Sequence, residues 1–321
     1  MALPFSIVDF ATSVDISRCK IQNTPDLLFL CGGPTAADGI GPYASARDFF
    51  HRYLINRKPA LANRVRLAEV LDEWFRRDRD KAFPDLLELE KYLAHLASLT
   101  VLFVESAGSI AELGAFAATD ALCPKTVAIM NEPIAQRPSF IKDGPVRRLE
   151  NVNPAQVLFY PWNLDDVKCA ENVEVFEEVS NDLVDMIEAK DRERPKQVAF
   201  DRGDTGHTLL LVADLLRLAG VAQDTAIAEC LRVLDCVKAG SELVRHFSIL
   251  QGVGFVAKRR RQTSTFYESH AIGTPFISYA FKDGDDIETD PLRVQVLLRD
   301  SLGKRETRIL QDSLRKAGQR V

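Results

Sequence analysis

Two continuous apolar segments, each ending in a turn that contains glycine, constrain the fold of this 321-residue chain most strongly. The first is Asp26-Leu-Leu-Phe-Leu-Cys31, which runs into Gly32-Gly33-Pro34. The second is Leu99–Val104, which runs into Glu105-Ser-Ala-Gly108. Strands that are apolar at every position are typical of parallel sheets covered by helices on both faces. We therefore expect two buried parallel strands, each followed by a sharp turn.

Helical and strand patterns alternate around these two segments. Helices are expected at Ala44–Leu54 and Leu86–Leu96, and further strands at Val65–Val70, Thr126–Met130 and Val157–Tyr160. This alternation predicts an α/β domain with a Rossmann-like (flavodoxin-like) parallel sheet over residues 1–163. Ligands bind such sheets outside the carboxyl ends of the strands.

The pattern changes after Trp162. Residues 164–195 are acidic and predict a connecting helix, and residues 196–321 predict a mostly α domain of three helices, a hairpin and a charged helical tail. That order resembles a winged helix-turn-helix domain. The expected helices and tail are Leu209–Leu218, Thr225–Val237, Ser241–Leu250 with Ser241 as N-cap, and Leu292–Ala317.

Charge and cysteine content narrow the class of protein. The net charge of -5 does not indicate a nucleic-acid binder, although a local basic patch remains compatible with it. The six cysteines form no CxxC pair, and no histidine pair has metal-ligand spacing, so we expect reduced thiols and no metal site. The N-terminus has no signal-peptide pattern and no segment approaches the roughly 20 apolar residues of a membrane span. We therefore expect a cytoplasmic protein without a membrane partner.

The motif Ser109-Ile-Ala-Glu112 has two interpretations. The first is a capping box, in which Ser109 caps a helix and Glu112 bonds back to its amide. The second is a site, because Glu105 and Gly108 share the same strand-to-helix junction and two nearby carboxylates repel each other. Such carboxylates suit cleavage of a glycosidic bond, in which one of them stabilises or attacks the cationic anomeric carbon.

The Gly32-Gly33-Pro34 turn would allow a sugar or phosphate to approach the backbone. It is neither G-x-G-x-x-G nor a P-loop, which argues against a dinucleotide-dependent dehydrogenase and against an ATPase. Glu69, near the end of the second strand, could approach the same crevice. The candidate substrate-binding residues are therefore Gly32, Gly33, Pro34, Glu69, Ser106, Gly108 and Ser109.

Basic residues at the predicted hairpin form a second candidate site. Lys258, Arg259, Arg260 and Arg261 lie at the inferred wing tip, where they either contact a nucleic-acid backbone or are simply solvated. Arg245 and His246, on the third helix, could face a groove. Because many winged helices bind protein instead, both interpretations stay open.

Three segments, Phe29–Gly33, Val104–Phe116 and Arg137–Arg147, resemble the effector proteins of type II retrons. Those are anti-phage systems that also contain a reverse transcriptase and its RNA–DNA hybrid. Their effectors join a nucleoside deoxyribosyltransferase-like domain to a C-terminal winged-helix region. By motif, the resemblance covers roughly Asp26–Trp162; the rest is similar only in architecture.

The resemblance implies cleavage of NAD+ or a related N-glycosidic bond, with NAD+ as substrate and no cofactor. It implies that Glu112 is catalytic, with Glu105 assisting, and that the partners are the reverse transcriptase and its hybrid. We also expect a homo-oligomer or filament. Deoxyribosyltransferases usually carry an aspartate six residues before their glutamate; this chain has Ser106 there, and its acidic residue is Glu105. This departure weakens a role in base exchange.

Two other functions fit the same pattern. One is a nucleotide sensor without turnover, coupled to a nucleic-acid-binding domain. The other is a transcription regulator whose first domain mediates dimerisation. The segment Arg137–Arg148 is either a surface loop or a contact to a neighbouring subunit or phosphate-bearing partner.

Overall fold

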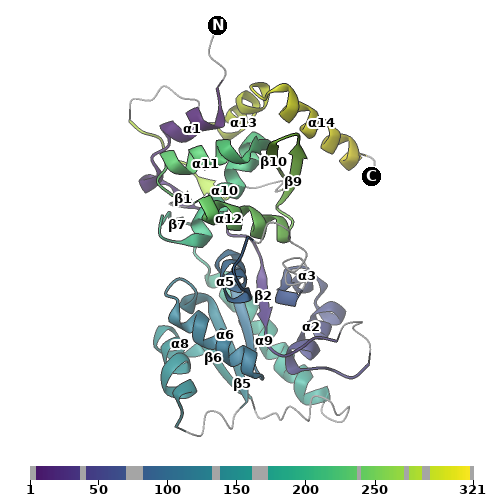
Figure 1. Cartoon of the computed structure of the whole chain (residues 1–321). Coiled ribbons are helices and arrows are strands. Elements are labelled where there is room, and N and C mark those ends of the chain that lie inside the picture. Colours follow the sequence, from purple (N-terminus) through teal and green to yellow (C-terminus); the bar gives the residue numbers. More distant parts are fainter. Residues whose placement is uncertain are drawn as a thin grey trace. The chain divides into compact units, whose positions relative to one another are not determined.

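The computed structural model describes residues 5–36, 41–69, 82–131, 138–160, 173–236, 240–270, 275–283 and 290–318. Several predicted positions lie outside these ranges, namely Val70, Arg137, Cys169, Val237 and residues 164–172 of the expected connecting helix. The chain divides into two compact units (Figure 1). We call them the sheet unit, Pro25–Arg77 with Asp85–Pro195, and the hairpin unit, Met1–Thr24 with Asp78–Pro84 and Lys196–Val321.

The sheet unit is built around five parallel strands in the order β3-β2-β4-β5-β6. Counted along the chain, these strands follow the order 2-1-3-4-5, which is the flavodoxin-like doubly wound order. The predicted α/β class with a Rossmann-like parallel sheet is confirmed. Its elements are β2 Leu28–Cys31, α2 Ala46–Arg57, α3 Pro59–Ala62, β3 Val65–Leu67, α5 Leu86–Leu96, β4 Leu99–Val104, α6 Ala107–Ala118, η2 Cys123–Lys125, β5 Thr126–Asn131, η3 Lys142–Val146, α8 Arg147–Val152, η4 Pro154–Gln156, β6 Val157–Tyr160 and α9 Val173–Glu193.

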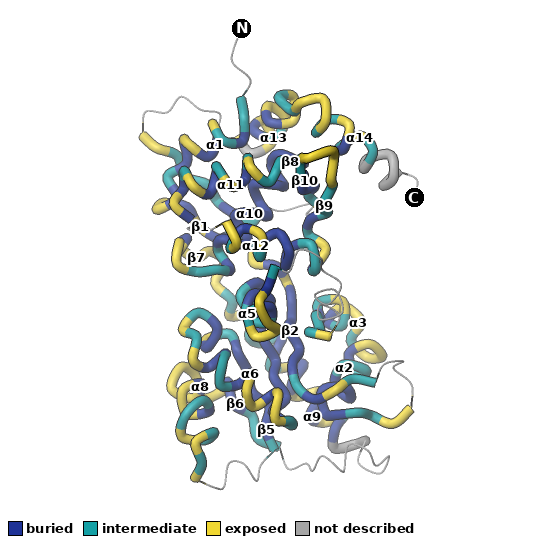
Figure 2. The backbone as a smooth tube through the Cα atoms, viewed as in Figure 1, coloured by how far each residue is buried: buried dark blue, intermediate teal, exposed yellow. Residues whose placement is uncertain are grey.

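Helices cover both faces of this sheet. All residues of β2 and β4 are buried, as their apolar sequence predicts (Figure 2). One face, which includes Leu30 and Phe103, packs against α2, α3 and α9. On the other face, the ring of Phe29 lies 6.1 Å from that of Phe116 on α6. In the strand order, β3 lies on one side of β2 and the later strands lie on the other, so the topological switch point of the sheet is between β2 and β4.

Helix α9 has a different role from the expected connector. Its described residues Phe176, Val179, Leu183, Val184 and Ile187 are buried in the same core as α2 and the sheet. The acidic composition of this segment belongs to its solvent side, while an apolar stripe at helical spacing anchors it. Residues 173–193 are thus part of the sheet unit.

The hairpin unit contains short helices and two small antiparallel sheets, with orders β8-β10-β9 and β11-β1-β7. Its central helix is α10, in which Leu209 to Ala219 are all buried (Figure 2). Its elements are α1 Ile7–Ser13, η1 Ile16–Arg18, β1 Lys20–Ile21, β7 Val198–Ala199, α10 Thr205–Ala219, β8 Val221–Gln223, α11 Asp224–Val233, α12 Gly240–Gly252, β9 Val256–Arg261, β10 Ser264–Ser269, β11 Ile277–Ser278, α13 Pro291–Asp300 and α14 Lys304–Gly318.

The N-terminal residues group with the hairpin unit, whereas we expected residues 1–163 to form one domain. The physical reason is that β1 pairs with β7 and β11, and that the thiol of Cys230 on α11 donates to the carbonyl of Ile7 at 3.5 Å. Short segments with few apolar residues gave no sequence signal for this long-range pairing.

One local prediction in the hairpin unit differs from the structure. Ser241 lies inside α12, which begins at Gly240, and so is not its N-cap. The expected helical tail consists of two helices, α13 and α14, separated at Ser301–Gly303. No helix within the described ranges has the length and apolarity needed to cross a membrane.

Candidate functional site

Helix α6 begins at the carboxyl end of β4, and Ser106 is its N-cap. The Ser106 hydroxyl accepts from the amide of Ser109 at 3.1 Å, and the Ser109 hydroxyl accepts from the amide of Ser106 at 2.9 Å. The capping box therefore joins Ser106 to Ser109. The predicted alternative, a box joining Ser109 to Glu112, is wrong because the helix begins three residues earlier than expected.

Glu112 lies in the second turn of α6 and has no part in the capping box. Its side chain is half-buried, and its Oε2 atom is buried without a hydrogen-bond partner among the residues that the structure describes. A buried carboxylate oxygen without a donor loses the stabilisation that water would give it. Such an atom is a natural place for a ligand group to bind.

Burial raises the pKa of Glu112 from 4.5 to about 7. The positive charge of Arg47 acts in the opposite direction, and the negative charge of Glu69 raises this pKa further. The charge of Glu112 in turn raises the pKa of the buried thiol of Cys31, after burial itself. These mutual effects place Glu112 in one electrostatic cluster with Arg47, Glu69 and Cys31, at the carboxyl end of β2.

Both carboxylate oxygens of Glu105 accept hydrogen bonds from backbone amides. Its Oε1 accepts from the amides of Gly33 at 2.9 Å and Arg47 at 3.2 Å, and its Oε2 accepts from the amide of Ala46 at 2.8 Å. Ala46 and Arg47 open α2, so the carboxylate also interacts favourably with the positive end of that helix. These three bonds give Glu105 a positioning role at the turn after β2 and at the start of α2.

The turn after β2 approaches β4 so closely that both glycines are needed. Gly32 has φ +144°, and a Cβ atom there would lie 2.8 Å from both Cβ and the carbonyl oxygen of Phe103. A Cβ on Gly33 would lie 2.7 Å from Cβ of Ser45 and 2.8 Å from Oε1 of Glu105. Gly32 and Gly33 therefore let the turn dock on Glu105, in addition to any contact with a ligand.

The remaining predicted substrate-binding residues differ in their exposure to solvent. Pro34 and Gly108 are exposed, Ser106 is half-buried, and Ser109 is fully buried with its hydroxyl satisfied within the helix start. Ser109 therefore stabilises α6 and cannot contact a substrate. Gly108 lies at the exposed N-terminus of α6, where its backbone amide forms part of the positive end of the helix dipole.

Arg47 is a buried cation that the sequence analysis did not identify. Its side chain is 2 % exposed and forms an ion pair with both carboxylate oxygens of Glu69, and it also donates to the carbonyl of Leu30 at 3.3 Å. Within the described ranges, the Nε atom of Arg47 has no hydrogen-bond partner. A signal existed in the sequence, because Arg47, Phe50 and Leu54 fall on one apolar stripe of α2.

These groups can stabilise opposite charges at one strand edge. A carboxylate whose pKa is near 7 can act on a cationic carbon when ionised. A buried guanidinium and a helix N-terminus can bind phosphate or hydroxyl oxygens. Within the described part of the chain, no three His, Cys, Asp or Glu side chains gather into a group that could hold a metal.

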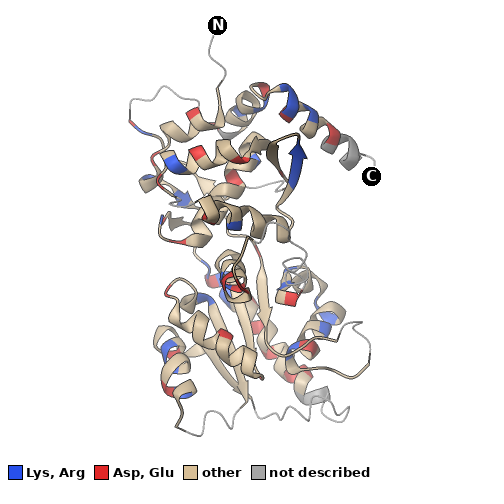
Figure 3. Cartoon of the chain, in the orientation of Figure 1, with Lys and Arg blue, Asp and Glu red and all other residues tan. Residues whose placement is uncertain are grey.

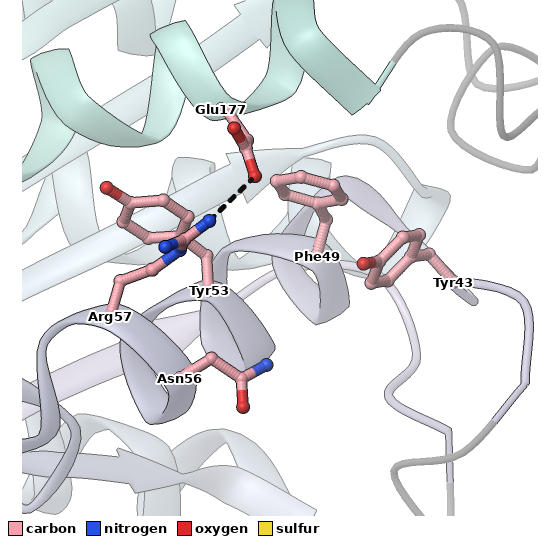
Figure 4. A pocket seen from close by; sticks show the side chains of 6 residues that line it. All are labelled: Tyr43, Phe49, Tyr53, Asn56, Arg57 and Glu177. Carbon is pink, nitrogen blue, oxygen red and sulfur yellow. Dashed lines mark ion pairs between the residues drawn. The ribbon is translucent and has the colours of Figure 1, made fainter.

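A separate cavity of about 370 Å³ lies between α2 and α9 (Figure 4). Its walls include the rings of Tyr43 and Phe49, whose centroids are 4.6 Å apart, and the ion pair of Arg57 with Glu177 at 3.9 Å. None of the predicted site residues lines this cavity. Arg47 is not among the residues that line it.

The segment after residue 137 forms an exposed surface of the sheet unit. Phe140 is 87 % exposed, Arg147 forms an ion pair with Asp143 at 3.1 Å, and Arg148 forms one with Asp120 at 2.5 Å. These cations are partly neutralised on the surface.

The basic residues of the hairpin unit lie along strand β9 (Figure 3). We predicted that they form the tip of the hairpin, but the turn is Gln262–Thr263 and the four cations precede it. Strand alternation divides them between two faces, with Lys258 opposite Tyr267 and Arg259 opposite Phe266. Arg259 also pairs with the buried Glu268 at 3.1 Å.

The expected groove-facing side chains of α12 are not available to a groove. His246 is fully buried, with its Nδ1 atom 2.6 Å from the carbonyl oxygen of Glu242. Arg245 is half-buried and donates to the carbonyl of Ala82 at 3.4 Å. Helical spacing alone could not predict this, because residues 82–84 are distant in sequence yet belong to the same unit.

Comparisons with known proteins agree on one family. A family model described as "STM3845 retron effector protein" matches residues 43–258. The Escherichia coli protein named "Retron Ec73 putative ribosyltransferase/DNA-binding protein" is 23% identical over 261 residues, which cover 77% of this chain and 80% of that protein. The Escherichia coli protein named "Retron Ec86 putative ribosyltransferase/DNA-binding protein" is 38% identical over 90 residues, or 28% of this chain and 29% of that protein.

Proposed function

The chain belongs to the STM3845 retron effector protein family, and from that premise we propose that its sheet unit cleaves the N-glycosidic bond of NAD+ or a related nucleotide. One observation carries the proposal. Glu112 presents a buried carboxylate oxygen that has no hydrogen-bond partner in the described part of the chain, and the charge of the buried Arg47 acts on it at the strand edge where doubly wound sheets bind ligands. The printed names of the two Escherichia coli relatives, which include the word ribosyltransferase, support a reaction at a ribosyl carbon.

The reaction breaks the bond between the anomeric carbon and the base nitrogen, and the bonding electrons leave with the base. When the base is nicotinamide, its positively charged nitrogen becomes neutral, so no proton need be added to it. The ionised carboxylate of Glu112 stabilises the cationic sugar carbon or bonds to it. Water then supplies a hydroxyl group to that carbon and its second proton leaves to solvent.

We assign distinct roles to the residues around Glu112. Glu105 holds the Gly32-Gly33 turn and the start of α2 in place through its three amide contacts. Arg47 keeps a positive charge next to Glu112, which favours the ionised carboxylate at neutral pH. The backbone at Gly108, at the N-terminus of α6, offers amide donors to a phosphate of the substrate.

We propose that the hairpin unit is a winged helix-turn-helix domain. The order α10, β8, α11, α12, β9, β10, with an antiparallel sheet β8-β10-β9, supports this interpretation. The partners would be the retron reverse transcriptase and its RNA–DNA hybrid, which restrain the enzyme until phage infection. The active form would be a homo-oligomer or filament in the cytoplasm. The words "DNA-binding" in the relatives' names support a nucleic-acid partner.

The decisive experiment measures nicotinamide release from NAD+ by the full chain, alone and with the reverse transcriptase and hybrid. Glu112→Gln keeps the size of the side chain and removes its charge, so we expect it to lower the rate at least about 100-fold. Glu150→Gln, at an exposed position on α8, is the matched control and should leave the rate unchanged.

The contrasting result would be NAD+ that binds and is recovered intact by wild-type protein in every combination of partners. That result would support the alternative function, a nucleotide-sensing regulator that binds nucleic acid and does not turn over its ligand. Equal rates for wild type and Glu112→Gln would instead reject the assignment of the catalytic carboxylate.

A further inference from the structure

A basic pocket lies beside the β9–β10 turn in the hairpin unit, separate from the residues assigned to catalysis. Its volume is about 500 Å³, and it is lined by Arg261, Gln262, Arg305, Arg308 and Asp312. Three of these five side chains are arginines, and one is acidic. The pocket is therefore a cationic hollow within a chain whose net charge is -5.

Packing explains why these arginines meet. Strand alternation places Arg261 on the same face of the hairpin as Phe266. Ile309 of α14 is buried and packs with Phe266 and Val221 on that face, which lays α14 along the hairpin. One helical turn before Ile309, Arg305 donates to Oε1 of Gln262 at 2.7 Å. The pocket is thus formed by the turn and by the polar side of a docked helix.

Asp312, the acid among the described lining residues, does not neutralise the pocket. Asp312 lies 3.6 Å from Arg261, and the two side chains are 46% and 53% exposed. An ion pair with that exposure is worth little and is easily exchanged for another anion. Guanidinium groups bind phosphate oxygens through paired N–H donors, so three of them around one hollow suit a phosphate ligand.

Helix α12 offers a poorer surface for the same ligand. Its His246 is buried and its Arg245 bonds to the carbonyl of Ala82, whereas its exposed positions include Ser241 and Val244. Phe247 of α12 stacks on Tyr267 with ring centroids 3.7 Å apart, so this face of the hairpin is covered by the helix. The available cationic surface is on the opposite, α14 side.

We propose that this pocket, rather than α12, binds the sugar-phosphate backbone of a nucleic acid. The proposal does not depend on the activity assigned to Glu112. Because the arginines of the pocket contact phosphates and not bases, we expect binding to depend on the shape and charge of the nucleic acid and not on its base sequence. The partner is a duplex or hybrid whose backbone lies over the pocket that the hairpin turn and α14 form together.

The test is fluorescence anisotropy of the full chain with a labelled DNA duplex and an RNA–DNA hybrid of about 20 base pairs, between about 50 and 200 mM salt. We expect the double variant Arg305→Ala, Arg308→Ala to raise Kd about 10- to 100-fold. The slope of log Kd against the logarithm of the salt concentration should fall by about 2, because two phosphate contacts are lost. Arg232→Ala is the matched control, because Arg232 is a 71% exposed arginine on α11 that pairs with Glu229.

A second variant separates the proposal from simple misfolding. Asp312→Asn removes the one acid among the described lining residues, so we expect binding about two- to fivefold tighter, which loss of structure cannot produce. The proposal is overturned if the double variant binds like Arg232→Ala, or if Asp312→Asn weakens binding. It is also overturned if an acidic peptide binds the pocket while neither nucleic acid does.

Discussion

The carboxylate of Glu105, at the end of β4, accepts a hydrogen bond of 2.9 Å from the amide of Gly33, which follows β2. The two residues are 72 positions apart in sequence but belong to neighbouring parallel strands. The same carboxylate accepts from the first two amides of α2, so one side chain fixes two loops and a helix. The strand edge beside Glu112 is thereby held rigid before any ligand arrives.

Replacing Glu105 by glutamine should destabilise this edge. The amide nitrogen of glutamine would face a backbone donor, and the charge that interacts with the N-terminus of α2 would be lost. We expect the free energy of unfolding to fall by about 1–3 kcal/mol, measured by urea denaturation. Glu150→Gln, at an exposed position, should change it by less than about 0.5 kcal/mol. Equal stability of the two variants would show that Glu105 does not hold the loops.

A methyl group at Gly33 should be poorly tolerated. It would lie 2.7 Å from Cβ of Ser45 and 2.8 Å from Oε1 of Glu105, so the turn must move away from β4. We expect Gly33→Ala to lower the free energy of unfolding by about 1–3 kcal/mol and to reduce activity. The matched change Gly114→Ala places a methyl in open space on α6, where it should stabilise the protein by about 0.5–1 kcal/mol.

Much of the sheet unit could be predicted from the sequence, because burial on both faces imposes continuous apolar runs. The strand at Val157–Tyr160 and the helix at Leu86–Leu96 have the predicted bounds, and β2, β4 and β5 agree within two residues. The location of Glu112 near the carboxyl edge also followed from its place just after the apolar strand at Leu99–Val104. Each of these features depends on local periodicity, which a single sequence contains.

Long-range contacts were beyond such reasoning. The bonds of Glu105 to Gly33 and the start of α2 depend on which strands become neighbours, and the burial of His246 depends on the packing of distant segments. The capping box was misplaced by three residues because Ser106 and Ser109 are equally good caps in isolation. Arg47 was overlooked because a cation near a helix start is usually solvated.

The rate of N-glycosidic cleavage should depend on the ionisation of Glu112. Its pKa is raised to about 7, chiefly by burial, and the ionised form is the one that stabilises a cationic carbon. We therefore expect kcat/KM to increase with pH and to level off above about 7. A profile of nicotinamide release between about pH 5 and 9 tests this. A rate that is flat across that range, or that falls as pH rises through 7, would contradict it.

The same pKa shift should appear in stability. The pKa of Glu112 is higher in the folded protein than the ordinary value of 4.5. The contribution of this carboxyl to the free energy of unfolding is therefore fully present below pH 4.5 and is lost as pH rises through 7. We expect Glu112→Gln to be more stable than wild type by about 2–3 kcal/mol above pH 7 and by little below pH 4.5. Urea denaturation at several pH values measures the difference. A constant difference across pH would mean that the carboxyl is not perturbed.

The charges around Glu112 should shift its titration in opposite directions. Arg47 lowers the pKa of Glu112 and Glu69 raises it, so Arg47→Met should move the rise in kcat/KM to higher pH and Glu69→Gln should move it to lower pH. Each shift should be about 0.5–1 pH unit, because one neighbouring charge is removed. Arg57→Met, on the same helix but paired with Glu177, serves as the control and should not move the profile. A structural defect would lower the rate but would not move the rise in kcat/KM to higher pH in one variant and to lower pH in the other. Opposite shifts of the two pH profiles therefore identify electrostatic coupling to Glu112. Shifts in the same direction would refute it.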